Sequence, residues 1–269
     1  QAKKFIPNNS VIYKLISDIQ EWRSENLDWE QAREKIVEKY GYDKFLGNCH
    51  IVPNHALIIM ALLFGDDDFK KTMMIVNTSG WDTDCNSGNV GCILGIKNGV
   101  EGLKSGPDYL SPINDILYCP TALGGETLTD ALTETYKIIN ITRKINGLKK
   151  NLPKNGARFH FNIKDSTQGW KVRKGKNYCK TKINNVEYKS SLGERALKIS
   201  YYNSLKDYTS EVYVETFFPE VILDLKGKKR DDFFSYDYIS CPTIFPGQRV
   251  TIETENISSH EILISFFSK

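Results

Sequence analysis

Two aspartates separated by one residue, Asp82 and Asp84, are the side chains most suited to chemistry in this sequence. They lie in the polar run 80–86 (GWDTDCN), between two predicted helices. Two carboxylates that converge at a turn can hold one hard cation, because oxygen ligands suit Mg²⁺, Mn²⁺ and Ca²⁺. By spacing alone, however, an Asp-x-Asp pair in a loop is more often a solvated turn or a helix cap.

Helices on both sides must position this run. Apolar residues at helical spacing predict helices before and after it, and the candidate N-caps are Asn9 or Ser10, Asp28 and Asp68. The segment 55–64 is apolar nearly all round, which is typical of a helix in the middle of an all-helical domain. The glycines at 91, 95 and 99 share one face of a helix and predict close helix contact. The predicted helices cover residues 10–22, 29–40, 55–64, 68–77, a stretch after Asn86, and 128–145.

The order of these segments resembles the ADP-ribosylglycohydrolase family. The run 53–56 (PNHA) opens the apolar helix, 65–69 (GDDDF) follows its end, and the Asp-Thr-Asp-Cys-Asn stretch precedes the glycine stripe. The resemblance covers roughly residues 45–105, and more loosely 8–147. It is most specific in the Asp-Thr-Asp-Cys-Asn stretch.

The resemblance implies an all-helical fold that holds two divalent cations, Mg²⁺ or Mn²⁺. It also implies hydrolysis of the bond between the anomeric carbon of ribose and a small-molecule or protein acceptor. Asp82 and Asp84 match the family's C-terminal metal ligands and are the predicted catalytic residues. The cations would orient the ribose hydroxyls and activate a water, and a carboxylate could assist as general base.

Two features depart from the family pattern. Cys85 stands where many members have Thr or Ser, and a thiol is a soft ligand poorly matched to Mg²⁺. The family's N-terminal Thr/Ser-Asp-Asp motif does not precede Asp82. We therefore expect an incomplete helical domain, whose opposing ligands lie upstream of Gln1, lie in another chain or are lost. The alternative to a hydrolase is a non-catalytic module that binds ADP-ribose or a glycan, or an inactive fragment.

Three further residues are predicted to bind substrate: Asn54, Trp81 and Asn86. Asn54 stands near the start of the apolar helix, where an N-cap role is the alternative. Trp81 could wall the pocket or belong to the core. Asn86 could orient a ligand carboxylate or cap its own helix.

The spacing of apolar residues changes after residue 148, from a helical pattern to the alternation typical of β-strands. Residues 1–148 form the predicted helical domain, 149–157 a linker, and 158–269 an antiparallel, jelly-roll-like β-sandwich. Strands are predicted around 197–201, 212–216, 250–252 and 262–267. The runs 159–162 (FHFN) and 166–170 (STQGW) are similar to the opening of galactose-binding-like modules. That similarity implies a possible glycan site built on exposed tyrosines.

The amino-acid composition limits the classes of binding partner that we expect. With 36 basic and 33 acidic residues the net charge is only +3, so neither nucleic acid nor an anionic membrane is expected as a partner. Hydrophobic residues make up 40% and charged residues 26%, which predicts a soluble globular protein. The compartment is not determined, although the cytoplasm is favoured. The six cysteines include no Cys-x-x-Cys pair, which argues against a zinc site and a dense disulfide framework.

Overall fold

The computed structural model describes residues 2–47, 49–190, 193–202, 208–255 and 263. The chain divides into two compact units, a helical unit (residues 1–112) and a second unit (residues 113–269). The sequence placed its domain change later, at 149–157, and that division stays a prediction. Helices followed by a region that contains antiparallel sheets are confirmed. Within the described residues, no helix combines the length and apolar character needed to cross a bilayer.

The described residues of the helical unit form five α-helices and two short 3₁₀ turns. The predicted caps are confirmed: Ser10 accepts from the amide of Tyr13, and Asp28 forms a reciprocal capping box with Gln31. Asp68 likewise accepts from the amide of Lys71. The α-helices are α1 (Val11–Ser24), α2 (Trp29–Tyr40), α3 (Ile51–Phe64), α4 (Phe69–Thr78) and α5 (Thr83–Gly102), and the 3₁₀ turns are η1 (Ala2–Phe5) and η2 (Leu103–Ser105).

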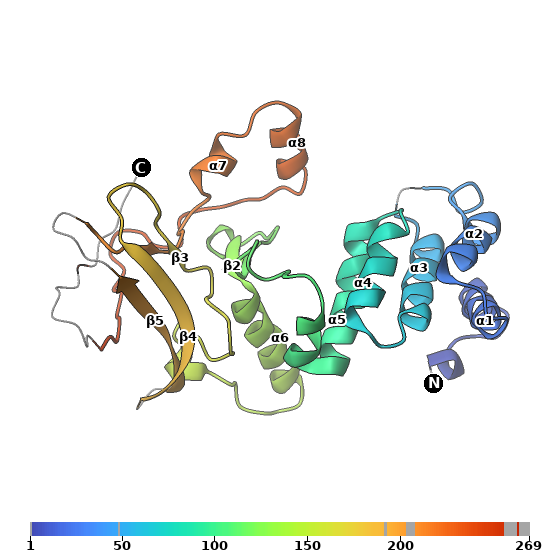
Figure 1. The fold of residues 1–269 in the computed structure, drawn as a ribbon, viewed down its shortest axis with the longest axis horizontal. Coiled ribbons are helices and arrows are strands. Elements are labelled where there is room, and N and C mark those ends of the chain that lie inside the picture. The colour runs from blue at the N-terminus through green and yellow to red at the C-terminus, as the bar shows by residue number, and fades with distance from the viewer. Residues whose placement is uncertain (1, 48, 191–192, 203–207, 256–262, 264–269) are drawn as a thin grey trace. The chain divides into compact units, whose positions relative to one another are not determined.

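The apolar helix α3 is the centre of this unit, as its composition predicted. It packs against α1 and α2 on one side and α4 and α5 on the other (Figure 1). Ala56, Leu57, Met60 and Ala61 are completely buried in the core. Each large apolar side chain buried in this way contributes about 2 kcal/mol. α3 therefore gives its neighbours, including the start of α5, a rigid support.

Two expectations about α5 are wrong. The helix begins at Thr83 instead of after Asn86, so Asp84, Cys85 and Asn86 lie in its first turn. The glycine stripe does not bring helices close together within the described residues. A Cβ on Gly91 would meet Met73 only at 3.9 Å, and one on Gly99 would meet nothing within 4 Å. Gly99 instead interrupts the helix, with φ of 67° and ψ of −178°.

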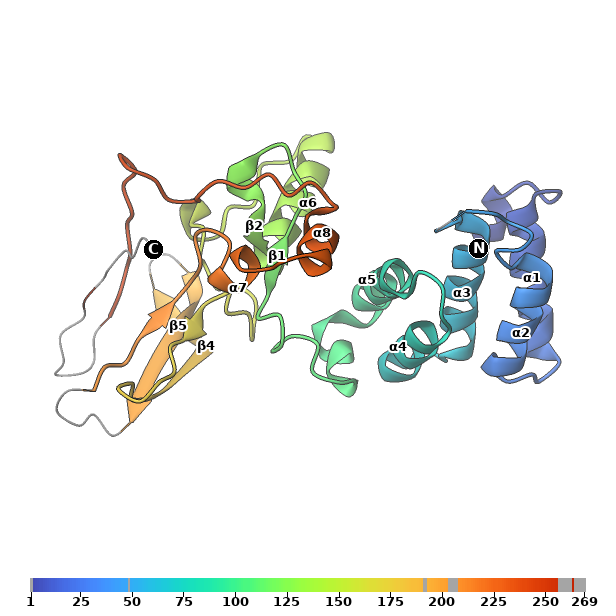
Figure 2. The same cartoon turned by 90° about the horizontal axis from the view of Figure 1, so that it is seen from above.

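In the second unit, the residues that the structure describes form three antiparallel two-stranded sheets. The longest is a hairpin of β4 (Lys180–Ser190) and β5 (Gly193–Tyr202), which confirms the strand predicted at 197–201 (Figure 2). The other pairs are β1 (Ile116–Tyr118) with β2 (Leu128–Asp130), and β3 (Lys171–Val172) with β6 (Val212–Tyr213). The remaining elements are η3 (Gly124–Glu126), α6 (Ala131–Ile145), η4 (Pro153–Gly156), α7 (Glu220–Leu223) and α8 (Lys228–Phe234).

The β-sandwich itself is not confirmed, because the described strands do not form two facing sheets. Residues 128–130 are a strand, and the helix predicted from 128 begins only at Ala131. Residues 250–252 form no strand, so that prediction is wrong. The predicted strand 262–267 lies outside the described residues, apart from Leu263.

The run 166–170 has a structural role in the second unit instead of forming a strand. The carboxylate of Asp115, which is buried, accepts hydrogen bonds from Ser166 Oγ at 2.8 Å and from the amide of Thr167 at 3.0 Å. Gln168 is also buried. Its backbone amide donates to the carboxylate of Asp115, and its side-chain Nε2 donates to the carbonyl oxygen of Arg158. These hydrogen bonds connect Asp115, which directly precedes β1, to the run 166–170, more than fifty residues later in the sequence.

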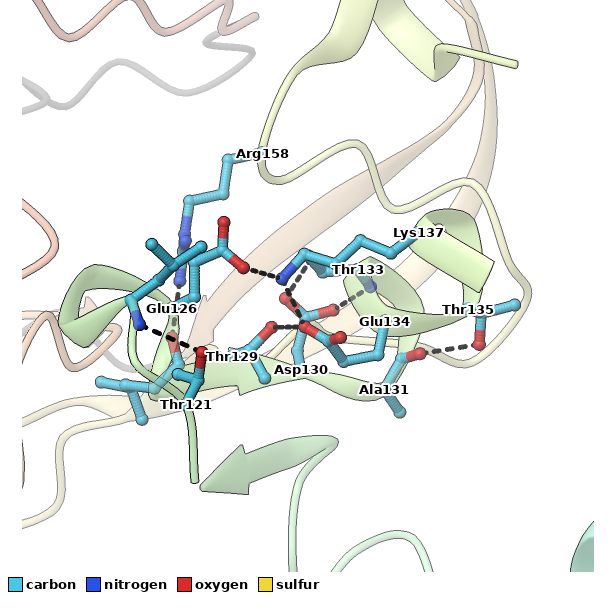
Figure 3. A network of polar contacts seen from close by, with 12 residues as sticks. Thr121, Glu126, Thr129, Asp130, Ala131, Thr133, Glu134, Thr135, Lys137 and Arg158 are labelled. Atoms are coloured by element: carbon cyan, nitrogen blue, oxygen red, sulfur yellow. Dashed lines mark hydrogen bonds and ion pairs between the residues drawn. The ribbon is translucent and has the colours of Figure 1, made fainter. Parts of the chain in front are cut away.

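A second polar network surrounds the start of α6 (Figure 3). Asp130 caps the helix by accepting from the amide of Thr133 at 2.9 Å. Glu134 accepts from Thr129 Oγ1 at 2.7 Å and from Lys137 Nζ at 2.9 Å, and Lys137 also reaches Glu126. Burial opposes the charged form of Glu134. The bonds from Lys137 and Thr129 outweigh it and hold its pKa below the ordinary value.

Replacing Glu134 by Gln should make the protein less sensitive to acid. Because the pKa of Glu134 is lowered on folding, its carboxylate stabilises the fold above the ordinary carboxyl pKa. That contribution is lost as pH falls through the folded-state pKa. The variant should lose less stability than the unmodified chain between about pH 6 and about pH 3, measured by urea unfolding. Glu126→Gln, a half-exposed partner of the same lysine, is the control. Parallel pH profiles for the unmodified chain and Glu134→Gln would contradict this account.

Candidate functional site

The loop between α4 and α5 is an unusually tight bend. Gly80, Trp81 and Asp82 follow one another with φ of 73°, 48° and 33°, all in the left-handed region. For residues other than glycine this conformation costs roughly 1–2 kcal/mol each. The bend places Asp82 as the N-cap residue of α5, although its side chain caps no amide. The carboxylate is therefore not occupied as a helix cap.

Contacts from α2 and α5 hold the bend in place. Arg33 Nε donates to the carbonyl oxygen of Ser79 at 2.6 Å, and its guanidinium lies 4.0 Å from the centre of the Trp81 ring. The Trp81 ring also lies 4.9 Å from the ring of Tyr42. Asn86, almost completely buried, donates to the carbonyl oxygen of Trp81 at 3.4 Å. These contacts offset the strain of the left-handed residues.

The bend and the first turn of α5 bring together three possible metal ligands. One ligand atom each from Asp82, Asp84 and Cys85 lies within 4.8 Å of the others, and this is the one such group in the described part of the chain. Asp82 is half-buried, while Asp84 and Cys85 are exposed. The sequence-predicted pair Asp82 and Asp84 thus converges on one place.

A hydrogen-bonded chain from α3 orients the carboxylate of Asp82. Asn54 Nδ2 donates to Asp82 Oδ2 at 2.5 Å, and Asn54 Oδ1 accepts from the hydroxyl of Tyr42. Asn54 is buried, so its side chain has few alternative positions. Asn54 belongs to the core helix α3, so the position of α3 sets the orientation of Asp82.

Comparison with known proteins places this site in a family. The family model described as ADP-ribosylglycohydrolase matches residues 1–138, which include every residue of the site. The chain belongs to the ADP-ribosylglycohydrolase family. No curated protein and no solved structure matches it.

The donor chemistry of this ADP-ribosylglycohydrolase family member fits a divalent cation only in part. Metal dependence is general in the family, and two converging carboxylates suit such an ion. The third donor, Cys85, is a sulfur atom and departs from the all-oxygen set that Mg²⁺ prefers. The thiol of Cys49, on the segment before α3, lies near Asp82 but is not part of this ligand group.

The carboxylates dominate the electrostatics of this site. A hydrogen bond to Asp82, with burial and the charges of both aspartates, raises the pKa of Cys85 to about 11. A hydrogen bond to Asp82 is also the main cause that raises the pKa of Cys49. Burial and the charge of Asp82 raise the pKa of Tyr42. The negative charge of Asp82 thus contributes to the raised pKa of all three neighbouring groups.

The capping alternatives for two of the predicted residues are wrong. Asn54 is not an N-cap, because His50 caps α3 through its Nδ1 and Asn54 lies inside the helix. Asn86 lies inside α5, where Asp82 is the N-cap residue, and it donates to the carbonyl oxygen of Trp81. Orientation of a ligand carboxylate by Asn86 stays a prediction. Trp81 packs against the core while remaining partly exposed. Contact of these residues with substrate stays a prediction.

Sequence reasoning missed Arg33, Tyr42 and Cys49. They lie on other segments, and nothing in their local sequence marks them as neighbours of residues 80–86. The acidic run 66–68 is not part of the ligand group. Asp66 pairs with Arg23 and Lys71, Asp67 pairs with Lys97, and Asp68 caps α4.

The site lies on the surface of the helical unit. A hollow of about 290 Å³ beside the start of α2 is lined by Leu27, Trp29 and Phe64 among others, and it contains none of the ligand group. The exposure of Asp84 and Cys85 leaves the group open to an ion or a substrate.

Replacing Arg33 by Lys should destabilise the helical unit by about 2 kcal/mol. Lysine keeps the charge, but it loses the fixed geometry that bonds Ser79 and covers Trp81 together. Urea unfolding followed by tryptophan fluorescence measures the loss. Arg23→Lys is the control, because its ion pair with Asp66 is exposed and contributes about 0.5 kcal/mol or less. Equal stabilities for the two variants would show that the contacts of Arg33 with Ser79 and Trp81 do not stabilise the bend.

Proposed function

We propose that this chain is part of a divalent-metal-dependent hydrolase of glycosidic bonds, with a ribosyl bond as the substrate class. Asp82 and Asp84 are the proposed ligands and catalytic carboxylates. The convergence of their oxygen atoms with Cys85 at the start of α5 carries the proposal. Membership of the ADP-ribosylglycohydrolase family supports ADP-ribose, free or attached to a protein, as the substrate.

The protein's own residues supply the positioning. Asn54 and Tyr42 hold Asp82 in one orientation, so little side-chain entropy is lost when a ligand binds. Asp84, which is exposed, has room to accept a proton from a water or a ribose hydroxyl as general base. Trp81, partly exposed beside the carboxylates, offers a flat apolar surface to a substrate ring. A divalent cation, when bound here, supplies Lewis-acid polarisation of oxygen atoms.

The proposed ions are Mg²⁺ or Mn²⁺, with two ions in the complete site. The alternative proposal is a chain that binds ADP-ribose without cleaving it. One observation favours that alternative: within the described residues, one ligand group is found and not two facing each other. For the second unit, a jelly-roll sandwich that binds a glycan stays a prediction. Tyr202 and Tyr208 are the most exposed of its candidate rings.

Asp82→Asn and Asp84→Asn should each abolish Mn²⁺ and Mg²⁺ binding in calorimetry, and with it any hydrolysis of ADP-ribosylated substrate. Asparagine tolerates the left-handed backbone at position 82, so the variant should fold. Asp67→Asn is the matched control, because Asp67 is also left-handed but pairs with Lys97 outside the site. Unchanged ion binding in both site variants would refute the metal site. Ion-dependent ADP-ribose binding without turnover would favour the binding module.

Asn54→Ala should weaken ion binding by about 10–100-fold, the usual effect of removing a partner that orients a ligand. Tyr42→Phe should weaken binding less, because Asn54 would remain bonded to Asp82. Calorimetric titration measures both affinities, and Tyr13→Phe on α1 is the control. If Asn54→Ala bound ions as tightly as the unmodified chain, the carboxylate of Asp82 would not depend on α3 for its orientation.

A further inference from the structure

Positive charge is concentrated in one segment of the second unit. Residues 149–202 contain 14 lysines and arginines against three aspartates and glutamates. This segment therefore carries +11, although the whole chain carries only +3, and the rest of the chain is net negative. The net charge of the whole chain, which argues against a polyanionic partner, averages over this separation. A charge asymmetry of this size within one chain is typical of a protein that binds a polyanion.

The hairpin of β4 and β5 presents part of this charge on one side (Figure 2). In the half of the hairpin away from its turn, side chains at alternate positions share a face, and the register continues that face across both strands. Neither of the two strand segments, 180–184 and 198–202, contains an acidic residue. The exposed side chains of this surface, which we call the lysine face, are Lys180, Lys182, Asn184, Lys198 and Tyr202.

The opposite face of the hairpin is bonded to the rest of the second unit. Thr181 Oγ1 lies 2.9 Å from Ser210 Oγ, within hydrogen-bond distance. Asn185 Nδ2 donates to the carbonyl oxygens of Phe161 at 2.8 Å and of Ile163 at 3.0 Å. These bonds fix which side of the hairpin is turned towards the unit and leave the lysine face on the solvent side.

The three lysines of the lysine face are close together and lack acidic partners. Strand geometry puts Lys180 and Lys182 about 7 Å apart, and Lys182 lies diagonally across from Lys198 at a similar spacing. Among the described residues, none of the three forms an ion pair, whereas Arg173 pairs with a glutamate and so does Arg195. Like charges at this spacing repel one another, and a bound anion would relieve that repulsion.

Exposed tyrosine rings accompany the lysines. Tyr202, which is 49% exposed, is the cross-strand partner of Lys180. A β-bridge between Tyr178 and Thr209 brings Tyr208, which is 43% exposed, to the start of β4. Proteins bind single-stranded nucleic acid with this combination, because rings stack on bases while basic side chains contact phosphates. In a duplex the base faces are already stacked, so the rings would have no such role.

We propose that the lysine face, together with Tyr208, binds single-stranded nucleic acid. Lys180, Lys182 and Lys198 contact phosphates of the backbone, and Tyr202 stacks on a base. The proposal goes beyond the glycosidic hydrolase, since it uses the second unit and none of the metal-ligand group. A competing role for the lysines is to keep the hairpin from pairing with strands of another molecule, which lysines on exposed strands commonly do. That role requires no ligand.

Fluorescence anisotropy of a labelled oligo(dT) of about 12 nucleotides, titrated with the full chain, tests the proposal. A chelating buffer keeps divalent ions, and hence the proposed metal site, out of the measurement. The combined variant Lys180→Gln, Lys182→Gln and Lys198→Gln should bind more than about tenfold more weakly at low salt. The slope of log affinity against log salt concentration should also become shallower by about 2, as the loss of three phosphate contacts to a single strand predicts.

The matched control removes the same charge from another part of the second unit. It combines Lys226→Gln, Lys228→Gln and Lys229→Gln, three exposed lysines at and just before the start of α8. This variant should keep its affinity within about threefold and retain the salt dependence of the unmodified chain. Thermal unfolding of each variant checks that it is folded.

The stacking role of Tyr202 has its own signature. Tyr202→Leu should weaken binding about tenfold, because a base loses its aromatic partner. Its salt dependence should stay unchanged, because no phosphate contact is lost. Tyr202→Phe keeps the ring and should bind as tightly as the unmodified chain.

Three results would overturn the proposal. Equal losses in the two triple-lysine variants would mean that binding follows net charge and not the lysine face. Tighter binding to a duplex of the same length, or to phosphatidylserine vesicles, would exclude single-stranded nucleic acid as the preferred partner. Unchanged affinity in the lysine-face variant, accompanied by new aggregation, would establish protection of the strands instead. The metal site is tested separately by ion binding, so none of these results affects it.

Discussion

The left-handed bend at Gly80, Trp81 and Asp82 is the constraint on which the helical unit's site depends. It lets the chain reverse between α4 and α5 while placing one aspartate at the junction and the next in the first turn of the new helix. Two of the three residues pay a conformational cost, which the contacts of Arg33 with Ser79 and Trp81 offset. The Arg33 contacts thereby support the bend that brings the two carboxylates together.

The core helix α3 connects this bend to the rest of the unit. Its buried apolar residues fix its position, and Asn54 near its start transmits that position to Asp82 through one hydrogen bond. Tyr42 fixes the amide in turn. A site on an exposed surface is thus oriented by groups whose own places are set by core packing, which is how a rigid ligand geometry is usually achieved.

The second unit is organised by polar networks more than by a continuous sheet. Asp115 joins the β1 loop to the run 166–170, and Lys137 joins Glu126 to Glu134 at the start of α6. Bonded groups of this kind, buried at Asp115 and partly exposed at Lys137, hold loops where short strands bury little apolar surface. The family match ends within α6, and the proposed ligands Asp82 and Asp84 lie in the helical unit.

Local signals in the sequence were enough to place the helices of the first unit, the caps at Ser10, Asp28 and Asp68, and the candidate pair Asp82 and Asp84. Helical periodicity and capping depend on neighbours within about four residues, so one sequence contains them. Only the tertiary structure decided that α5 starts at Thr83, that the glycine stripe is open, and that Arg33, Tyr42, Asn54 and Cys49 surround the bend. These are contacts between segments distant in the chain. They are set by how the faces of α2, α3 and α5 pack, which no local pattern specifies.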